Sequence, residues 1–250
     1  MSFKDYNLIS PPPIKPKRDK AFQNSFTLAE GATHVDILRN YRSNAFTLAE
    51  VLITLGIIGV VAALTLPTLI QKHKKIEYAS KLKQFYSMMS QAILISEINN
   101  GDKSTWSKTP PQFDEDGNRD LQGDKNANYE FFMKYIAPYL KYTKETIKQN
   151  NTFYLANGTK ISMGNGSCVD FNVDVNGDKK PNEFGRDMFN FHVCIKKNYP
   201  PIGVYSLYIP QGHTRTELVD LCANYIDRNF CTPLIMKDGW EFKDDYPFKL

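Results

Sequence analysis

Apolar residues are concentrated in one uninterrupted block near the start of the chain. From Val51 to Ile70 the side chains are mostly apolar and none is charged. At roughly 1.5 Å of rise per residue, a helix over this block would cross the ~30 Å hydrocarbon core of a bilayer. The block therefore predicts a transmembrane segment at about residues 51–70.

Helical periodicity continues beyond this block. Apolar residues recur at helical spacing as far as Ile98, and Asn99-Asn100-Gly101 then provides a stop signal. One helix over residues 46–98 would measure roughly 80 Å, with its first half in the membrane and its second half packed on a head domain. The stripe expected to face the head contains Leu82, Phe85, Tyr86, Met89, Ala92 and Ile93.

The head, residues 99–250, shows signals for short elements only. Residues 101–128 are polar and predict a loop, and residues 129–140 predict a short amphipathic helix that Pro138 bends or ends. Asn157-Gly158 predicts the turn of a β-hairpin. The strands expected in the head are 152–155 and 160–163 around that turn, then 168–173, 188–195, 204–209, 234–237 and 240–242.

One long helix followed by short strands indicates an α+β fold with a small antiparallel sheet. Residues 1–45 contain Pro11-Pro12-Pro13 and interspersed basic residues, and they predict a disordered leader. Within this leader, Phe26 to Glu30 repeats the sequence Phe-Thr-Leu-Ala-Glu of Phe46 to Glu50. The residues after this upstream copy are too polar to span a membrane.

Glu50 lies immediately before the apolar block, where a carboxylate forced into lipid costs about 2.5–3.5 kcal/mol. The segment Phe46-Thr47-Leu48-Ala49-Glu50, followed by an apolar helix, resembles the start of type IV pilin-like proteins. These are the type IV pilins and the pseudopilins of type II secretion. Gly56, Gly59 and Pro67 also stand where that family has small or helix-loosening residues.

The resemblance implies that a prepilin peptidase removes residues 1–45 by cutting between Ala45 and Phe46, and that Phe46 is then N-methylated. Ala45 departs from the glycine usual before the cut. Glu50 would pair with the terminal amine of a neighbouring subunit. The implied partners are the peptidase, other pilin-like subunits, an assembly platform in the inner membrane and membrane lipid, with the leader cytoplasmic and the head periplasmic or extracellular.

Two other interpretations explain the apolar block less completely. A secretory signal peptide would begin at the N-terminus and be cut after its apolar region, whereas here a leader and a polar box precede it. A simple membrane anchor would explain the apolar residues but not the box.

The net charge of +4 is divided unevenly along the 250 residues. The leader carries seven basic and four acidic residues, so the rest carries 24 against 23 and is close to neutral. A near-neutral body offers no electrostatic basis for nucleic-acid binding. The lysines just after the block oppose the positive-inside rule for this orientation, since Arg39 and Arg42 precede it and Lys72, Lys74, Lys75, Lys81 and Lys83 follow it.

All four cysteines, Cys168, Cys194, Cys222 and Cys231, come after the apolar block. An even set on one side of a membrane favours disulfides in an oxidising compartment. A zinc site is the alternative, although no Cys-x-x-Cys pair is present. A hairpin would bring Cys168 near Cys194, so we hypothesise the pairs Cys168–Cys194 and Cys222–Cys231.

The segment from Asp174 to Asn182 places several oxygen-bearing side chains in a short loop. Its Asp-x-Asn-x-Asp start resembles the calcium loops of dockerins and EF-hands, and major pseudopilins carry calcium in their heads. The resemblance implies Asp174, Asn176, Asp178, Asn182 and Asp187 as ligands, with the Lys180 carbonyl. Lys179 and Gly185 depart from the EF-hand pattern, and the alternative is a polar turn between two strands.

The sequence contains no catalytic motif that we recognise. His34, His73, His192 and His213 are scattered, and neither a His-Glu-x-x-His nor a Gly-x-Ser-x-Gly pattern occurs. We therefore expect a non-enzymatic pseudopilin of type II secretion. The alternatives are a type IV pilin of a surface or DNA-uptake filament and, less favoured, a membrane-anchored hydrolase.

Overall fold

The computed structural model describes residues 46–142, 144–146, 150–197, 199–204 and 212–250. The chain divides into two units, Met1–Thr47 and Leu48–Leu250, and the second contains nearly all of the described residues. The predicted leader, Ala45, the upstream copy Phe26 to Glu30 and most of the strand expected at 204–209 lie outside the described residues.

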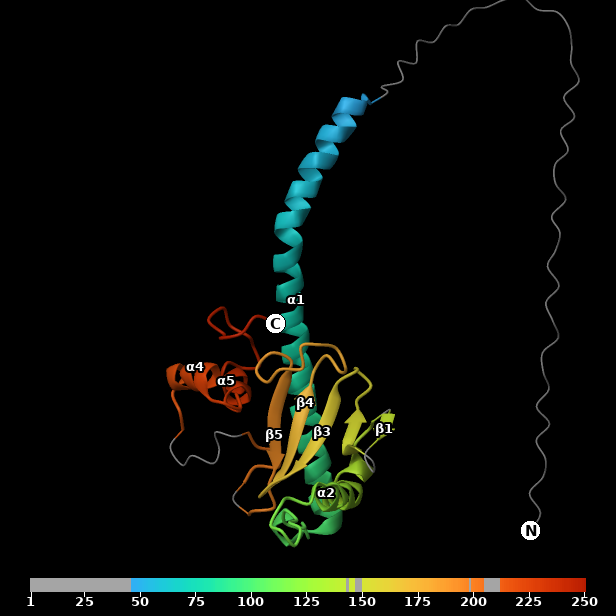
Figure 1. Cartoon of the computed structure of the whole chain (residues 1–250), viewed down its shortest axis with the longest axis vertical. Helices are drawn as coiled ribbons and strands as arrows, with labels where there is room; N and C mark the ends of the chain where they lie inside the picture. Colours follow the sequence, from blue (N-terminus) through green and yellow to red (C-terminus); the bar gives the residue numbers. More distant parts are fainter. Residues whose placement is uncertain (1–45, 143, 147–149, 198, 205–211) are drawn as a thin grey trace, which may run out of the picture. The chain divides into compact units, whose positions relative to one another are not determined.

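Helix α1 (Leu48–Asn100) is a single helix of 53 residues (Figure 1). The sequence prediction of one long helix is confirmed, with both ends shifted by two residues. Gly101 follows with φ +80°, a conformation that glycine adopts without the cost of a side chain, so the predicted stop signal ends the helix. Pro67 lies inside the helix without ending it.

The second half of α1 packs on the head through one face. Leu82, Phe85, Met89 and Ile93 are fully buried in the hydrophobic core. Their spacing of three or four residues keeps them on one side of the helix, as the sequence periodicity predicted. The complete buried set on α1 is Tyr78, Ala79, Leu82, Phe85, Met89, Ala92, Ile93 and Ser96.

The described part of the head contains one antiparallel sheet in the order β1-β2-β3-β4-β5. Each strand pairs with its neighbours in sequence, so the sheet is a meander, and α1 runs along it (Figure 1). Burial alternates along β3 and along the first part of β4, as expected when one face of a sheet covers a core. The strands are β1 (Lys144–Thr146), β2 (Thr152–Tyr154), β3 (Lys160–Asn165), β4 (Val169–Asp174) and β5 (Met188–Val193).

Aromatic side chains join α1 to the sheet. The ring of Phe85 lies 5.0 Å from that of Phe191 and 6.3 Å from that of Phe171, centroid to centroid. The C-terminal segment adds Trp240, whose ring contacts Tyr86 and Phe191. Tilted and stacked rings at these separations add stabilisation to the burial of their apolar area.

Several helices were not predicted. The helix expected at 129–140 begins eight residues earlier, as α2 (Leu121–Tyr135), where the Asp120 carboxylate caps the amides of Gln122 and Gly123. Thr214 and Glu217 form a capping box that starts α4. The remaining elements are the 3-10 turns η1 (Lys103–Thr105) and η2 (Ala137–Tyr139) and the helices α4 (Arg215–Asn224) and α5 (Cys231–Lys237).

Two strand predictions near the C-terminus are wrong. Residues 234–237 belong to α5, and residues 240–242 form an irregular segment. An apolar run of only a few residues is too short to show helical or strand periodicity. Here Leu234 and Ile235 are buried as part of a helix. The strands expected at 152–155, 160–163, 168–173 and 188–195 correspond to β2, β3, β4 and β5.

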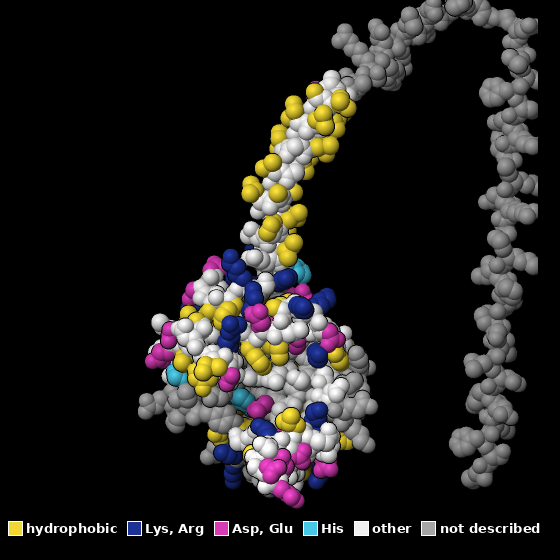
Figure 2. All heavy atoms as spheres, in the orientation of Figure 1, with side chains coloured by type: hydrophobic (Ala, Val, Ile, Leu, Met, Phe, Trp, Pro, Cys, Tyr) yellow, Lys and Arg dark blue, Asp and Glu magenta, His cyan; other side chains and the backbone are white. Residues whose placement is uncertain are grey.

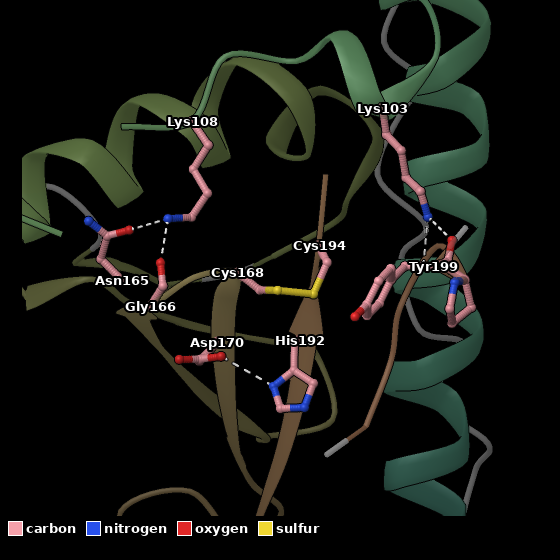
Figure 3. Close-up of a disulfide and its surroundings, with 10 residues drawn as sticks. Lys103, Lys108, Asn165, Gly166, Cys168, Asp170, His192, Cys194 and Tyr199 are labelled. Carbon is pink, nitrogen blue, oxygen red and sulfur yellow. Dashed lines mark hydrogen bonds and ion pairs between the residues drawn. A yellow bond between two sulfur atoms is a disulfide. The ribbon is translucent and has the colours of Figure 1, made fainter. Parts of the chain in front are cut away.

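Two disulfides link elements of the head, and their pairing is the one hypothesised from the sequence. Cys168 is bonded to Cys194 where β4 begins and β5 has just ended, and Cys222 is bonded to Cys231 between α4 and α5. Buried polar contacts surround the first bond (Figure 3). Lys108 donates to the Asn165 side chain and the Gly166 carbonyl at 2.6 and 2.7 Å.

We expect Phe85→Ala to lower the free energy of unfolding by about 3–5 kcal/mol, because it opens a cavity between α1 and two strands. Ser87→Ala, two residues away on the exposed face, is the matched control and should change it by less than about 0.5 kcal/mol. Chemical denaturation of the detergent-solubilised chain, followed by near-UV circular dichroism, measures both. Equal effects would show that α1 does not form the core.

Candidate functional site: the N-terminal assembly segment and the acidic loop

The predicted processing and assembly residues lie at the exposed start of α1. Phe46 comes two residues before the helix and is 83% exposed. Glu50 lies in the first turn of α1 and is exposed. The amide groups of a helix N-terminus carry partial positive charge, so a carboxylate is favourable there. Ala45, the residue expected before the cut, lies outside the described residues.

The first half of α1 presents an apolar surface on all sides. Among the described residues α1 is the one helix long and apolar enough to cross a membrane, and none of its most apolar 18-residue window is buried. The hydroxyls of Thr54 and Thr65 donate to the carbonyls of Val51 and Val61, so both donors are satisfied within the helix. Such a surface needs lipid or other helices around it.

Gly56 and Gly59 lie on this surface three residues apart. A side chain added at either position would meet no atom within 4 Å. Contacts within the chain therefore do not require glycine here, whereas a second helix could approach the backbone closely at both positions.

The acidic loop between β4 and β5 brings together three of the five predicted calcium ligands. Asp174 and Asp187 are 5% and 1% exposed, and their negative charges face each other across the loop. The amide of Asn176 donates to the Asp187 carboxylate at 2.9 Å. The Oδ1 atom of Asn176 is buried without a hydrogen-bond partner.

The other two predicted ligands make different contacts. Asp178 accepts from the Tyr154 hydroxyl at 2.9 Å and pairs with the Lys160 ammonium at 2.8 Å, so its carboxylate is held against β2 and β3. Asn182 donates its backbone amide to Asp187. Tyr154 and Lys160 were not predicted from the sequence, although the Asn157-Gly158 turn sets the register that pairs them.

This arrangement fits a self-contained polar turn better than a protein cage for calcium. Calcium takes six to eight oxygens, and three side chains converge here. Both oxygens of Asp187 already accept backbone amides, from Asn182 at 2.9 Å and Glu183 at 2.7 Å. In the described part of the chain, no three His, Cys, Asp or Glu side chains are placed to hold a metal. Calcium binding stays a prediction.

His192 has a structural environment. Its Nδ1 lies 3.2 Å from the Asp170 carboxylate, beside the Cys168–Cys194 bond (Figure 3). Its backbone exchanges two hydrogen bonds of 2.8 Å with Gly203. Its position within β5, paired with β4 on one side and Gly203 on the other, indicates a structural role.

The pKa of Asp174 is raised to about 6, first by burial and then by the nearby Asp187 charge. The folded head therefore keeps a proton that the unfolded chain releases near pH 4, so the free energy of unfolding should fall as pH rises from about 4 to 6. Asp174→Asn should reduce this fall, while Asp116→Asn, at an exposed position outside the loop, is the control and should leave it unchanged. Thermal melts in a chelator across pH 4–7 measure it, and an unchanged slope in Asp174→Asn would contradict the assignment.

Added calcium offers a separate test of the loop. A cation that binds only the folded head raises the melting temperature by mass action. If Asp174 is a ligand, calcium at pH 7 should raise the melting temperature of the unsubstituted chain and not that of Asp174→Asn. Equal responses of the two proteins would remove Asp174 from any calcium site.

Comparison with known protein families gives two matches along the chain. Residues 40–66 match the prokaryotic N-terminal methylation motif, which includes Phe46 and Glu50. Residues 68–250 match a family of unknown function, DUF6613. Searches among curated proteins and among solved structures gave no match. The chain thus belongs to the DUF6613 family and carries the N-terminal methylation motif of type IV pilin-like proteins.

Proposed function

We propose that this chain is the subunit of a pilin-like filament, and specifically a pseudopilin of a type II secretion system. The observation that carries the proposal is the methylation motif at the start of a 53-residue helix whose apolar half is unburied. A monomer must hold such a helix in lipid, and a filament can bury it among identical helices.

In this proposal a prepilin peptidase cuts between Ala45 and Phe46, and Phe46 becomes the methylated first residue. Before this cut, the subunit lies in the inner membrane with its leader in the cytoplasm and its head in the periplasm. Both disulfides lie in the head, which suits an oxidising compartment.

Assembly would use the charge at the start of α1. Once the leader is removed, the terminal amine of one subunit can pair with the Glu50 carboxylate of the next. Two opposite charges that enter an apolar environment together offset part of the desolvation that each would suffer alone. The open surface at Gly56 and Gly59 supports close helix packing in the same segment.

The continuity of α1 gives the assembly a mechanical role. The same helix carries the apolar half and contributes Leu82, Phe85, Met89 and Ile93 to the head core. Force applied to the packed helices is transmitted to the head through that core. We infer a structural function, as is usual for pilin-like proteins, rather than an enzymatic one.

A type IV pilin whose head meets an external ligand is the second candidate. One feature favours it. Ile226 is 95% exposed in the loop that the Cys222–Cys231 bond closes, so the head presents an apolar side chain on a constrained loop. Such a side chain suits contact with an external partner.

We expect Glu50→Gln to insert into the membrane but to assemble poorly, because the amide cannot pair with a terminal amine as a charge. Glu130→Gln, which removes an exposed acid from the head, is the control and should assemble normally. Fractionation after cross-linking separates inserted monomer from oligomer. Oligomers of Glu50→Gln at the unsubstituted level would remove the assigned role from Glu50.

A further inference from the structure

Basic side chains surround α1 where its apolar half meets the head. Figure 2 shows Lys and Arg side chains gathered around the helix at this level. We define the basic collar as Lys72, Lys74 and Lys75 on α1 with Lys180 and Arg186 in the loop between β4 and β5. These residues line two hollows beside the helix.

The first hollow is a groove of about 730 Å³ between α1 and the C-terminal segment. Lys72 and Lys75 line it together with the apolar side chains of Ile76, Trp240 and Phe242. Basic groups beside aromatic and aliphatic surface match the region of a bilayer where charged headgroups meet acyl chains.

The second hollow, of about 240 Å³, lies against α1 as well. Lys74, Lys180 and Arg186 contribute its basic groups, and Tyr78, Asp187 and the C-terminal residue Leu250 also line it. Residues from two separate parts of the sequence therefore bring positive charge to the same level of the helix.

Part of this charge is not neutralised by the protein. Lys75 lies 3.6 Å from the Asp244 carboxylate and Arg186 lies 3.2 Å from that of Glu183. In the described part of the chain, Lys72, Lys74 and Lys180 have no carboxylate within 4.0 Å, and the nearby Glu77 pairs with Lys81 at 2.8 Å. Three ammonium groups are thus available to an anion.

The position of the basic collar along α1 indicates which anion it would meet. Lys72, Lys74 and Lys75 follow Ile70, the last residue of the apolar block, by about 3, 6 and 7.5 Å along the helix axis. The headgroup layer extends roughly 5–8 Å beyond the hydrocarbon core. The ammonium groups therefore lie at the depth of the lipid phosphates when α1 spans the bilayer.

We propose that the basic collar binds the phosphate groups of anionic phospholipids in the leaflet on the head side of the membrane. The inference rests on the proposed function, because it requires α1 to be membrane-inserted with the head outside. It also gives a use to lysines that oppose the positive-inside rule. Anionic lipid would hold the head close to the membrane before assembly.

The test uses the full-length chain in nanodiscs that contain phosphatidylglycerol and phosphatidylcholine at a fixed ratio. After mild detergent extraction, mass spectrometry measures the ratio of the two lipids retained by the protein. We expect phosphatidylglycerol to be enriched roughly threefold or more over the bulk ratio. The triple variant Lys72→Gln, Lys74→Gln, Lys180→Gln should retain the bulk ratio.

Two matched triple variants complete the design. Replacement of the same three lysines by arginine should keep the enrichment, because the positive charge remains. Replacement of Lys134, Lys141 and Lys197 by glutamine removes equal charge from other exposed positions of the head and should also keep it.

The outcomes separate this inference from the proposed function. A chain that inserts, as shown by resistance to carbonate extraction, but retains lipids at the bulk ratio overturns the collar and leaves the filament proposal intact. Unchanged enrichment in the glutamine triple variant overturns it equally. If that variant retains lipids at the same ratio as the unsubstituted chain but no longer forms oligomers, the collar contacts a neighbouring subunit instead of lipid. A chain that fails to insert overturns both proposals.

Discussion

The structure depends on one helix whose two halves are apolar in different ways. The first half of α1 must place apolar side chains on every side, whereas the second half must confine them to the stripe that faces the sheet. The change occurs within a few residues after Ile70, where lysines appear. Because the helix does not break there, the direction of its apolar half is coupled to that of the head, and the head core fixes the rotation of the helix.

The sheet of the head covers the apolar stripe on the second half of α1. A meander of short strands offers a flat apolar face with few long connections, and Phe85 meets the side chains of Phe171 and Phe191 on it. The C-terminal segment then returns to the same region, and Trp240 covers the edge of the aromatic cluster. The disulfides link β4 to β5 and α4 to α5, and each stabilises the head mainly by restricting the unfolded chain.

The elements that could be predicted are those with a strong local signal. The length of α1 was readable from the apolar block and the periodic stripe, and Asn157-Gly158 marked the β2–β3 hairpin. The C-terminal helix α5 was mistaken for a strand because a seven-residue helix gives too short an apolar pattern to show its period. The capping box of Thr214 and Glu217 is a signal in the sequence for the start of α4.

The candidate sites also differ in how far the sequence alone predicts them. Phe46 and Glu50 belong to a contiguous motif that the sequence shows directly, and their processing and assembly roles stay predictions. The acidic loop could not be judged from spacing, because the direction of each side chain depends on the strands beside it. Lys160 on β3 takes the Asp178 carboxylate away from Asp174 and Asp187, and two loop amides occupy Asp187. The collar has contributions from α1 and from the loop before β5, so only the fold brings its members together.

The central claim is that α1 begins as a processed assembly helix. Its most direct test is mass spectrometry of the N-terminal peptide from the chain extracted from its native membrane. We expect a first residue at Phe46 that carries an N-methyl group. An N-terminus that retains the leader, or one cut at a different bond, would contradict it.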